Sequence, residues 1–528
     1  MVTSRSGLMA LLSVLLLSTS CADSDGSVDG EGQVSDDAVC TEDRAGGSAT
    51  VATYLEPQGL DPVGLPGNAV TGGAELMALY DNLVSYDPET GKYEPRVAES
   101  VEPNDDFTVW TVKLREGITF GNGDPLTAQD VSISIDRHRS PDNFQVSSGE
   151  VKPIQEIEVV DDATLTFTLN EPYPTFPHVL ATDAGMITNP RIVDERGSEG
   201  FATNPAGGGV GPYEFERYAP GEEVVLKAKD DYWGGPVCID ELRFIRIAGA
   251  DATMDALEQG EVDVAFLREP QATDRARNGG FGELSTLINQ GEAVIMNGAQ
   301  SPTSDPLIRR AVAAAIDPEA LNQRVFDGTA KATSALVAEG TVGLEPTDGP
   351  TYDPEEAKRL VAEAKQNGWD GSIQLLADNA PIRVEESIAI AAMLEAVGFD
   401  VDLSNTSPLP DISSKVVVER DYELALWGPQ FYAEGTWATM NRVLGSASDS
   451  YYGYSDPAID PMLAELRLAT NDQERSAALN KIQDLLIENP FSANFVAIEE
   501  TWAFASRMHG LNLDRGSVVR FEQAFVTD

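Results

Sequence analysis

The chain has 528 residues, of which 87 are acidic and 36 basic, so its formal net charge is -51 at pH 7. A surface of this charge repels phosphate backbones and offers no basic face to an anionic membrane, which excludes nucleic-acid binding and electrostatic membrane adhesion. Hydrophobic residues make up 42% and charged residues 23% of the chain, which is typical of a globular protein of several domains and not of a disordered or polytopic membrane protein.

The first residues have the three-part layout of a secretory signal. One basic residue, Arg5, precedes the apolar run 8–17, and the small residues 18–20 lead to Cys21. The run is too short to span a bilayer permanently, so residues 1–20 are expected to be a removed signal peptide. A cysteine directly after small residues resembles a bacterial lipoprotein signal. We therefore expect an extracytoplasmic protein, anchored to the outer face of the cell membrane through an acylated Cys21, with ordinary secretion as the alternative.

The segment after Cys21 has the composition of a tether, and it contains one of two further cysteines. Residues 21–47 are mostly Asp, Ser and Gly, so they cannot bury enough apolar surface to fold and are expected to form a flexible acidic linker. Outside the cytoplasm two lone cysteines more often pair than stay free, and we therefore predict a structural disulfide between Cys40 and Cys238. Zinc needs more ligands than these, and the three histidines show no metal-ligand spacing, so no metal site is predicted.

From Ser48 onward, strand-like and helix-like segments alternate along the chain. Three segments have the β-prone composition or alternation of strands: 49–54, 108–114 and 164–169. Thr127, with Asp130 three residues later, predicts a helix start of the capping-box kind. Four Asp-Pro pairs predict further helix starts, because Asp caps a helix and Pro fits its first position: 305–306, 317–318, 353–354 and 456–457. Strands interleaved with helices predict an α/β fold.

An ordered series of short motifs extends over nearly the whole mature chain. The series comprises G-V-G-P-Y at 209–213, P-G at 220–221, Y-W-G at 232–234, L-x-x-G-E-V-D at 257–263, Asn297, R-x-A-x-x-x-A-I-D at 309–317, Y-D-P-x-x-A at 352–357 and Y-S-D-P at 454–457. Each motif alone is weak, but their order is specific. The series resembles the oligopeptide-, dipeptide- and nickel-binding proteins of ABC importers, which form family 5 of the bacterial solute-binding proteins.

This resemblance implies a two-lobed, clam-like periplasmic-binding-protein fold, in which the chain crosses between lobes twice and an extra subdomain is inserted into the first lobe. The expected first lobe comprises 48–82, 205–295 and 498–528, the inserted subdomain 83–204, and the second lobe 296–497. The resemblance also implies a monomer that encloses a small, preferably peptide-like, solute and delivers it to an ABC permease, without catalysis or a cofactor. Its membrane contact is expected only through the lipid anchor.

The resemblance implies that the ligand lies where the lobes meet. Peptide-binding members carry an Asp three residues after the Trp that corresponds to Trp427, and it pairs with the ligand's amino group; here that residue is Gln430. A neutral amide cannot supply this ion pair, so Glu434 is the candidate substitute, and sugars, modified peptides and metal chelates remain open as ligands. The candidate ligand-binding residues are Leu60, Asp61, Met296, Asn297, Trp427, Gln430, Phe431, Tyr432, Glu434 and Trp437. For Leu60, Asp61 and Asn297 the alternative is a role in shaping turns, and for Trp427 it is packing in the second-lobe core.

Two other classes of protein are alternatives to a solute-binding protein: a secreted hydrolase and a ligand sensor. A secreted hydrolase needs a nucleophile with an orienting base or a pair of carboxylates in strained surroundings. The chain has no G-x-S-x-G, no H-E-x-x-H and no glycine-rich phosphate loop, so no catalytic residue is assigned and a hydrolase is the remote alternative. A ligand sensor with the same fold remains an alternative function.

Overall fold

The structure is a computed structural model that describes residues 39–65, 67–140, 150–447 and 450–527. The predicted signal peptide, Cys21 and most of the predicted tether lie outside the described residues. Residues Val39–Asp528 form one unit by their contacts. Within the described part of the chain, no helix has the length and apolarity needed to cross a membrane.

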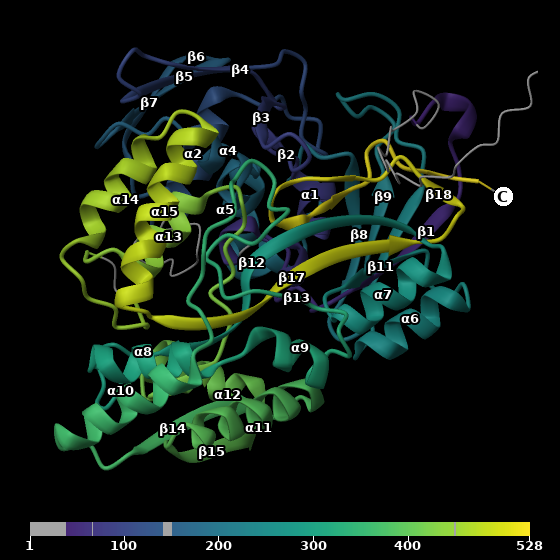
Figure 1. Ribbon diagram of the computed structural model, residues 1–528. Coiled ribbons are helices and arrows are strands. Elements are labelled where there is room, and N and C mark those ends of the chain that lie inside the picture. The colour runs from purple at the N-terminus through teal and green to yellow at the C-terminus, as the bar shows by residue number, and fades with distance from the viewer. Residues whose placement is uncertain (1–38, 66, 141–149, 448–449, 528) are drawn as a thin grey trace, which may run out of the picture. The chain divides into compact units, whose positions relative to one another are not determined.

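A mixed sheet of 11 strands organises this unit (Figure 1). In spatial order its strands are β15 (Asp400–Ser407), β14 (Ser372–Asp378), β16 (Leu424–Leu426), β12 (Gly282–Met296), β17 (Ser492–Phe504), β11 (Val264–Leu267), β1 (Ser48–Thr53), β10 (Glu241–Arg246), β9 (Glu223–Ala228) and β8 (Tyr213–Ala219), and β13 (Lys331–Ala332) pairs with β17. β1 is parallel to β10 and β11, and β14 is parallel to β15 and β16. Each half of the sheet thus has parallel strands, which need helical crossovers, and the predicted α/β fold is confirmed.

Helices cover the two halves of the sheet and the segments between them. They are α1 (Gly73–Tyr80), α2 (Ala128–His138), α4 (Pro177–Ala181), α5 (Pro190–Thr203), α6 (Ala250–Glu258), α7 (Pro270–Gly279), α8 (Pro306–Ala315), α9 (Pro318–Val325), α10 (Pro354–Gln366), α11 (Pro381–Ala396), α12 (Leu409–Ser413), α13 (Thr436–Leu444), α14 (Ile459–Leu468) and α15 (Asp472–Glu488). We use "first lobe" for β1, β8–β11 and the elements packed on them, and "second lobe" for β14–β16 with α8–α15. In Figure 1, β14 and β15 lie at the bottom with α10–α12, and α13–α15 lie at the upper left.

Most predicted helix starts are present. The side chains of Asp305, Asp317 and Asp353 accept hydrogen bonds from the first backbone N–H groups of α8, α9 and α10. The fourth Asp-Pro pair behaves differently: Asp456 accepts a hydrogen bond of 2.9 Å from the backbone N–H of Ala458, but residues 457–458 form a turn and α14 begins at Ile459. The same cap chemistry therefore gives a helix or a turn, depending on the following residues.

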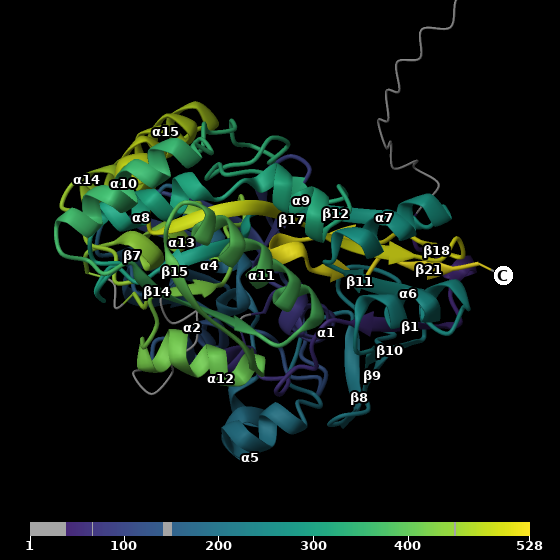
Figure 2. The same cartoon turned by 60° about the horizontal axis from the view of Figure 1, so that its bottom comes forward.

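Two long antiparallel strands, β12 and β17, connect the halves of the sheet and run side by side in Figures 1 and 2. Their pairing shifts register between Ile288 and Glu292. Within this bulge Gln290 has a φ of 50°, and a Cβ on Gly291 would lie 2.4 Å from the Ile498 side chain. The bulge lies before the predicted start of the second lobe at residue 296, and the end of β12 beyond the bulge pairs with β16 of that lobe. The two halves of the sheet therefore join at 289–291.

Most of the predicted insertion contains a second, antiparallel sheet, and we use "inserted subdomain" for the predicted range 83–204, although Ile192, Val193 and Phe201 of α5 pack in the first-lobe core. Its antiparallel sheet has the order β4 (Ala98–Pro103), β5 (Val109–Leu114), β7 (Thr164–Leu169) and β6 (Ile154–Asp161), and β2 (Val84–Asp87) pairs with β3 (Lys92–Pro95). Thr127 and Asp130 form the predicted capping box at the start of α2. Trp110, Phe167 and Phe176 lie in a hydrophobic core of its own. The predicted limits of the lobes stay a prediction, since the contacts join Val39–Asp528 into one unit.

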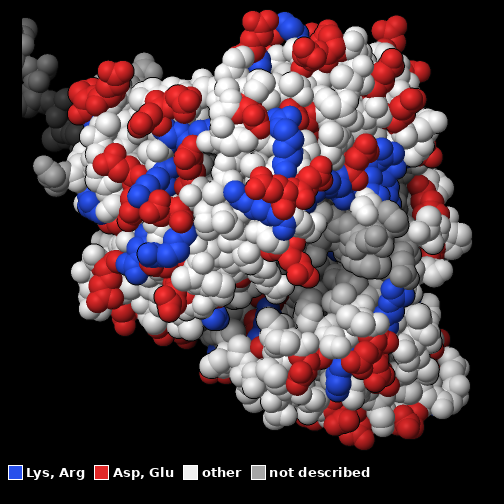
Figure 3. All heavy atoms as spheres, turned by 180° about the vertical axis from the view of Figure 1, so that it is seen from behind, with Lys and Arg blue, Asp and Glu red and all other residues white. Residues whose placement is uncertain are grey.

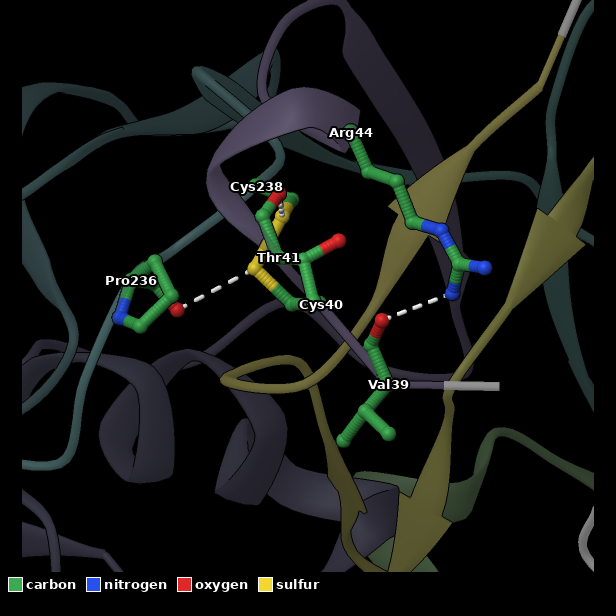
Figure 4. Close-up of a disulfide and its surroundings, with 6 residues drawn as sticks. All are labelled: Val39, Cys40, Thr41, Arg44, Pro236 and Cys238. Carbon is green, nitrogen blue, oxygen red and sulfur yellow. Dashed lines mark hydrogen bonds between the residues drawn. A yellow bond between two sulfur atoms is a disulfide. The ribbon is translucent and has the colours of Figure 1, made fainter. Parts of the chain in front are cut away.

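A disulfide holds the start of the described chain to the first lobe (Figure 4). Cys40 and Cys238 are bonded, with their Cα atoms 5.7 Å apart, which confirms the predicted pairing. Phe525 packs beside the bridge, and the Arg44 guanidinium lies 4.4 Å from the centre of its ring. The C-terminal segment contributes the short pairs β18 (Met508–His509) with β21 (Phe525–Val526) and β19 (Asn512–Leu513) with β20 (Val519–Arg520).

Acidic side chains dominate the face shown in Figure 3, and most basic groups border acidic ones. Arg359, for example, lies between Glu356 at 2.7 Å and Glu363 at 2.8 Å on α10. Exposed pairs of this kind contribute little to stability and are screened by salt.

Candidate ligand-binding site

The segment after β16 follows β12 back past the bulge toward the first lobe. The backbone N–H of Trp427 donates to the carbonyl of Ala293 (3.0 Å), and Phe431 and Asn289 exchange two backbone hydrogen bonds of 2.8 and 3.0 Å. Gly428 permits this approach, because a Cβ there would lie 1.9 Å from the carbonyl oxygen of residue 291. The segment thereby carries residues 432–437 from the second lobe to the first lobe and the inserted subdomain.

A pocket lies between this segment and the inserted subdomain, and we call it the inner pocket. Its cavity volume is about 30 Å³, so in this structure the side chains of its own wall nearly fill it. Rings with polar tips, which suit sites that are apolar at one end and wet at the other, supply much of its wall. Its aromatic and charged side chains include Tyr86, Tyr93 and Tyr173 from the inserted subdomain and Glu434, Trp437 and Arg475 from the second lobe.

Glu434 is the negative group of the inner pocket. It is buried, and its Oε1 accepts a hydrogen bond of 2.6 Å from the backbone N–H of Gly516. Burial raises the pKa of Glu434, and the hydrogen bond from Gly516 opposes that shift. Glu434 forms no ion pair with another described residue, so a cationic group of a bound molecule is its natural complement.

Arg475 on α15 is the positive group of the same pocket. It pairs with Asp472 one turn earlier, while its buried Nε has no hydrogen-bond acceptor in the described structure. Burial raises the pKa of Tyr86; Glu434 adds to that shift and Arg475 opposes it. Both charges therefore act on one tyrosine hydroxyl, which gives the pocket a negative and a positive side.

The inserted subdomain and the second lobe touch around the pocket. The Tyr173 and Trp437 rings lie edge to face with centroids 4.8 Å apart. Gly435 has a φ of +63°, and a Cβ on it would lie 2.2 Å from Nε2 of His178. The Tyr93 hydroxyl lies 3.1 Å from Nδ1 of that histidine. Only glycine permits this approach at position 435.

A second polar cluster lies beside the join of the two halves of the sheet. The Tyr432 hydroxyl donates to Oε2 of Glu500 (3.2 Å), and Nε of Arg268 lies 3.0 Å from Oε1 of the same carboxylate. The Arg268 guanidinium lies 5.5 Å from the centre of the Tyr54 ring. Burial raises the pKa of Glu500, and Arg268 lowers it. Tyr432 is thus held in a buried ion-pair network.

The candidates after β1 lie in packing and turn positions. Leu60 is fully buried in the first-lobe core, and its carbonyl accepts a hydrogen bond of 2.6 Å from the Tyr80 hydroxyl. Asp61 accepts from the backbone N–H of Val63 (3.2 Å) and pairs with Arg137 at 2.5 Å. Neither side chain lines the inner pocket.

The candidates at the end of β12 occupy similar positions. Met296 is fully buried in a second-lobe core. The Asn297 amide donates to the carbonyl of Arg420 (3.0 Å), and its oxygen accepts from the backbone N–H of Ala299 (3.1 Å). In this structure Asn297 therefore holds a turn.

The remaining candidates lie in the segment after β16 and in α13. Trp427 packs against a second-lobe core and donates from its indole nitrogen to the Tyr451 hydroxyl (3.3 Å). Phe431 is buried in the same core, and Gln430 has a φ of 55° in the segment along the bulge. Glu434 and Trp437 are the two sequence candidates that the structure brings together in the wall of the inner pocket.

The sequence analysis did not identify Tyr86, Tyr93, Tyr173 and Arg475 as candidate ligand-binding residues, yet all four line the inner pocket. Tyr86 and Tyr93 face each other across the β2–β3 pair, with ring centroids 5.1 Å apart. Two tyrosines on one face of a short hairpin are a detectable signal of a partly wet surface. The packing partner of that surface is the segment around Glu434, far along the chain, so the sequence did not reveal the pocket. Among the described residues, no cluster of three or more His, Cys, Asp or Glu side chains is arranged to hold a metal ion.

Comparison with known proteins gives three kinds of match. Residues 92–451 match the family model "Bacterial extracellular solute-binding proteins, family 5 Middle". The chain is 30% identical over 308 residues to the glutathione-binding protein GsiB of Shigella flexneri; the alignment covers 58% of this chain and 59% of GsiB, so it spans less than two thirds of that relative.

The fold is similar to that of AgaA from A. tumefaciens R10, solved with agropinic acid, with a TM-score of 0.76 and 23% identity over 91% of this chain and 99% of AgaA. It is similar also to Haemophilus influenzae OppA, solved with the peptide RPPGFSPFR, with a TM-score of 0.77 and 20% identity over 91% and 99% of the two chains. The structural matches confirm the two-lobed α/β architecture predicted from the sequence.

Proposed function

The chain belongs to family 5 of the bacterial extracellular solute-binding proteins, and on that premise we propose that it captures a peptide or peptide-like solute between its lobes and delivers it to the permease of an ABC importer. The observation that carries the proposal is the inner pocket, whose wall is shared by the inserted subdomain and the second lobe. A solute that contacts both walls favours their closed arrangement, and closure is the signal that a permease can read.

The chemistry of the pocket favours a solute with an amino group. Glu434 takes that group, since it is buried and has no ion pair with another described residue. The tyrosine hydroxyls and the backbone of 433–436 offer hydrogen bonds for the rest of the molecule. GsiB is named for glutathione, and OppA was solved with a peptide, which supports the peptide-like class. A sugar, a metal chelate or a sensor role without transport is the second candidate.

Capture of a solute needs the two lobes to close on it, and we assign this movement to the place where the lobes join. We keep the predicted bodies, with 48–82, 205–295 and 498–528 as the first lobe, 83–204 as its inserted subdomain and 296–497 as the second lobe, except that β12 beyond the bulge is assigned to the second lobe because its end pairs with β16. The bulge at 289–291 is the proposed bending point in β12, because a few residues in irregular conformations can absorb a hinge rotation.

Proteins of this family are extracytoplasmic, and we propose that this one is held at the outer face of the cell membrane through acylated Cys21. Stable anchoring takes more than one acyl chain, which lipoprotein processing supplies. The protein is proposed to act as a monomer, with the anchor as its one membrane contact. Labelling with radioactive palmitate should mark the wild type and not Cys21→Ser; equal labelling would rule out this anchor.

A thermal-shift screen tests the binding proposal. Purified protein is mixed with dipeptides, tripeptides and glutathione, and in parallel with sugars and chelated metals. A ligand that binds only the folded state adds about 2.7 kcal/mol of stability at a hundredfold excess over its dissociation constant. Stabilisation by peptides that Glu434→Gln abolishes is the expected result. A response to sugars or chelates alone would change the substrate class, and hydrolysis of the bound solute would favour the hydrolase.

A further inference from the structure

The loop Asp514–Ser517, which connects β19 to β20, lies against Glu434. It contains a short 3-10 turn, Arg515–Ser517, and all four of its residues are buried. Two consecutive residues have left-handed backbone conformations: φ is 61° at Gly516 and 57° at Ser517. That conformation is unfavourable for serine and persists only where surrounding contacts impose it. The contacts that hold this loop therefore need an explanation.

Asp514 fixes the start of the loop. Its Oδ1 accepts hydrogen bonds from the backbone N–H groups of Arg515 (2.7 Å) and Tyr86 (3.0 Å). Its Oδ2 pairs with Arg520 at 3.1 Å. Because Tyr86 belongs to β2, these contacts attach a loop of the first lobe to the inserted subdomain.

Two further hydrogen bonds fix the rest of the loop. Nε of Arg515 donates to the carbonyl of Ala181 at the end of α4 (2.6 Å). The indole nitrogen of Trp502 in β17 donates to the carbonyl of Ser517 (2.7 Å). The first lobe and the inserted subdomain thus hold the loop through contacts that do not involve Glu434.

The loop presents a backbone donor to the second lobe. The N–H of Gly516 donates to Oε1 of Glu434 (2.6 Å) and lowers the pKa of that carboxyl, which burial raises. His178 and Arg515 are the other groups that lower this pKa. A Cβ on Gly516 would lie 3.1 Å from Cβ of Asn68, so the donor lies in a closely packed place. The orientation of the carboxylate therefore depends on the position of the loop.

We propose that the loop Asp514–Ser517 is the positioning element of the ligand site and that Asp514 is its positioning residue. Asp514 holds the loop, and the N–H of Gly516 holds the Glu434 carboxylate in one orientation toward the amino group of the solute. This inference rests on the proposed function, in which Glu434 takes that group. Asp514 acts through Gly516 and needs no contact with the solute. Recognition by a second-lobe residue then depends on a first-lobe loop.

Calorimetric titration of the whole protein with trialanine and with N-acetyl-trialanine tests this. The wild type should bind the free amine at least about tenfold more tightly, because a charge-assisted hydrogen bond is lost on acetylation. Asp514→Ala should reduce that ratio about threefold or more, the effect of misplacing one hydrogen bond. Asp514→Asn is the matched control: it removes the same charge but keeps an acceptor oxygen, so the ratio should persist. The ratio should persist also in the Cys40→Ser, Cys238→Ser protein, which is destabilised elsewhere.

A second measurement needs no ligand. The carboxyl carbon resonance of Glu434, assigned by its absence in Glu434→Gln, reports the titration of this group by NMR. Its midpoint should lie at higher pH in Asp514→Ala than in the wild type, because the Gly516 hydrogen bond favours the ionised form, and Asp514→Asn should resemble the wild type. Gly516→Ala acts at the donor itself and should shift the midpoint in the same direction, which keeps the test valid if Asp514→Ala does not fold.

Three outcomes would overturn the inference. An unchanged ratio in Asp514→Ala, with both peptides bound more weakly, would show that the loop only supports the fold, and the proposed function would stand. Equal NMR midpoints in the wild type, Asp514→Ala and Gly516→Ala would exclude the positioning role even if neither peptide binds. Equal affinity of the wild type for the two peptides would contradict the proposed role of Glu434 and, with it, that of the loop.

Discussion

Replacing Gly435 by alanine should prevent the inserted subdomain and the second lobe from closing on a ligand. The new methyl group would lie 2.2 Å from Nε2 of His178, well inside the 3.4 Å at which ordinary contact begins. Overfilling a packed contact costs about 1–3 kcal/mol. If that cost falls on the closed state, affinity should decrease by roughly 5- to 150-fold.

The same substitution has a second effect that must be separated from the first. Gly435 has a φ of +63°, and a left-handed conformation costs an alanine about 1–2 kcal/mol. That strain lies within the second lobe and is equal in the open and closed states, so it should reduce the free energy of unfolding and leave affinity unchanged.

Two measurements on four proteins distinguish these effects. Calorimetry with the tightest solute of the screen reports affinity, and urea unfolding reports stability. Removing the histidine ring should restore affinity in the Gly435→Ala, His178→Ala protein to that of His178→Ala alone, while the loss of stability persists. Wild-type affinity of Gly435→Ala would refute the argument, and so would a double variant that binds as weakly as Gly435→Ala.

Three other variants test the account. Trp437→Ala should weaken binding at least about tenfold, because its ring contacts Tyr173 in the wall of the inner pocket, while circular dichroism stays that of the wild type; unchanged affinity would contradict this. Replacing Cys40 and Cys238 by serine should lower the free energy of unfolding by up to about 5 kcal/mol, because the bridge closes a long loop; equal urea midpoints would argue against it. Burial raises the pKa of Glu75 to about 7, above its value near 4.5 in an unfolded chain, so its contribution to stability falls as pH rises between these values, by up to about 3 kcal/mol. Urea unfolding at pH 5 and pH 8 should therefore show a smaller decrease for Glu75→Gln than for the wild type, and equal decreases would refute this.

Local signals predicted much of the fold. Asp305, Asp317 and Asp353 each cap a helix, because an Asp followed by Pro satisfies the first N–H groups whatever the surroundings are. The alternation at 164–169 became β7, whose inward side chains are buried and outward ones are half-buried. The two-lobed architecture was implied by the family resemblance, which rests on the order of motifs along nearly the whole mature chain.

The candidate site was predicted less completely, because a pocket is a contact between distant segments. Glu434 was found through the position of a missing Asp, and it lines the inner pocket. Asn297 and Asp61 were chosen for their polarity, yet in the structure each holds a turn in its own loop. Tyr86 and Arg475 become neighbours only when the inserted subdomain meets α15, and no local pattern encodes that contact.

The central claim is that a peptide-like solute lies between the inserted subdomain and the second lobe. A crystal structure of the protein grown with the tightest-binding solute of the screen tests it most directly. The account predicts density in the inner pocket, with the amino group within hydrogen-bond distance of Glu434 and the solute in contact with Trp437. Density elsewhere, for example beside Arg268 and Glu500 with the inner pocket empty, would contradict it.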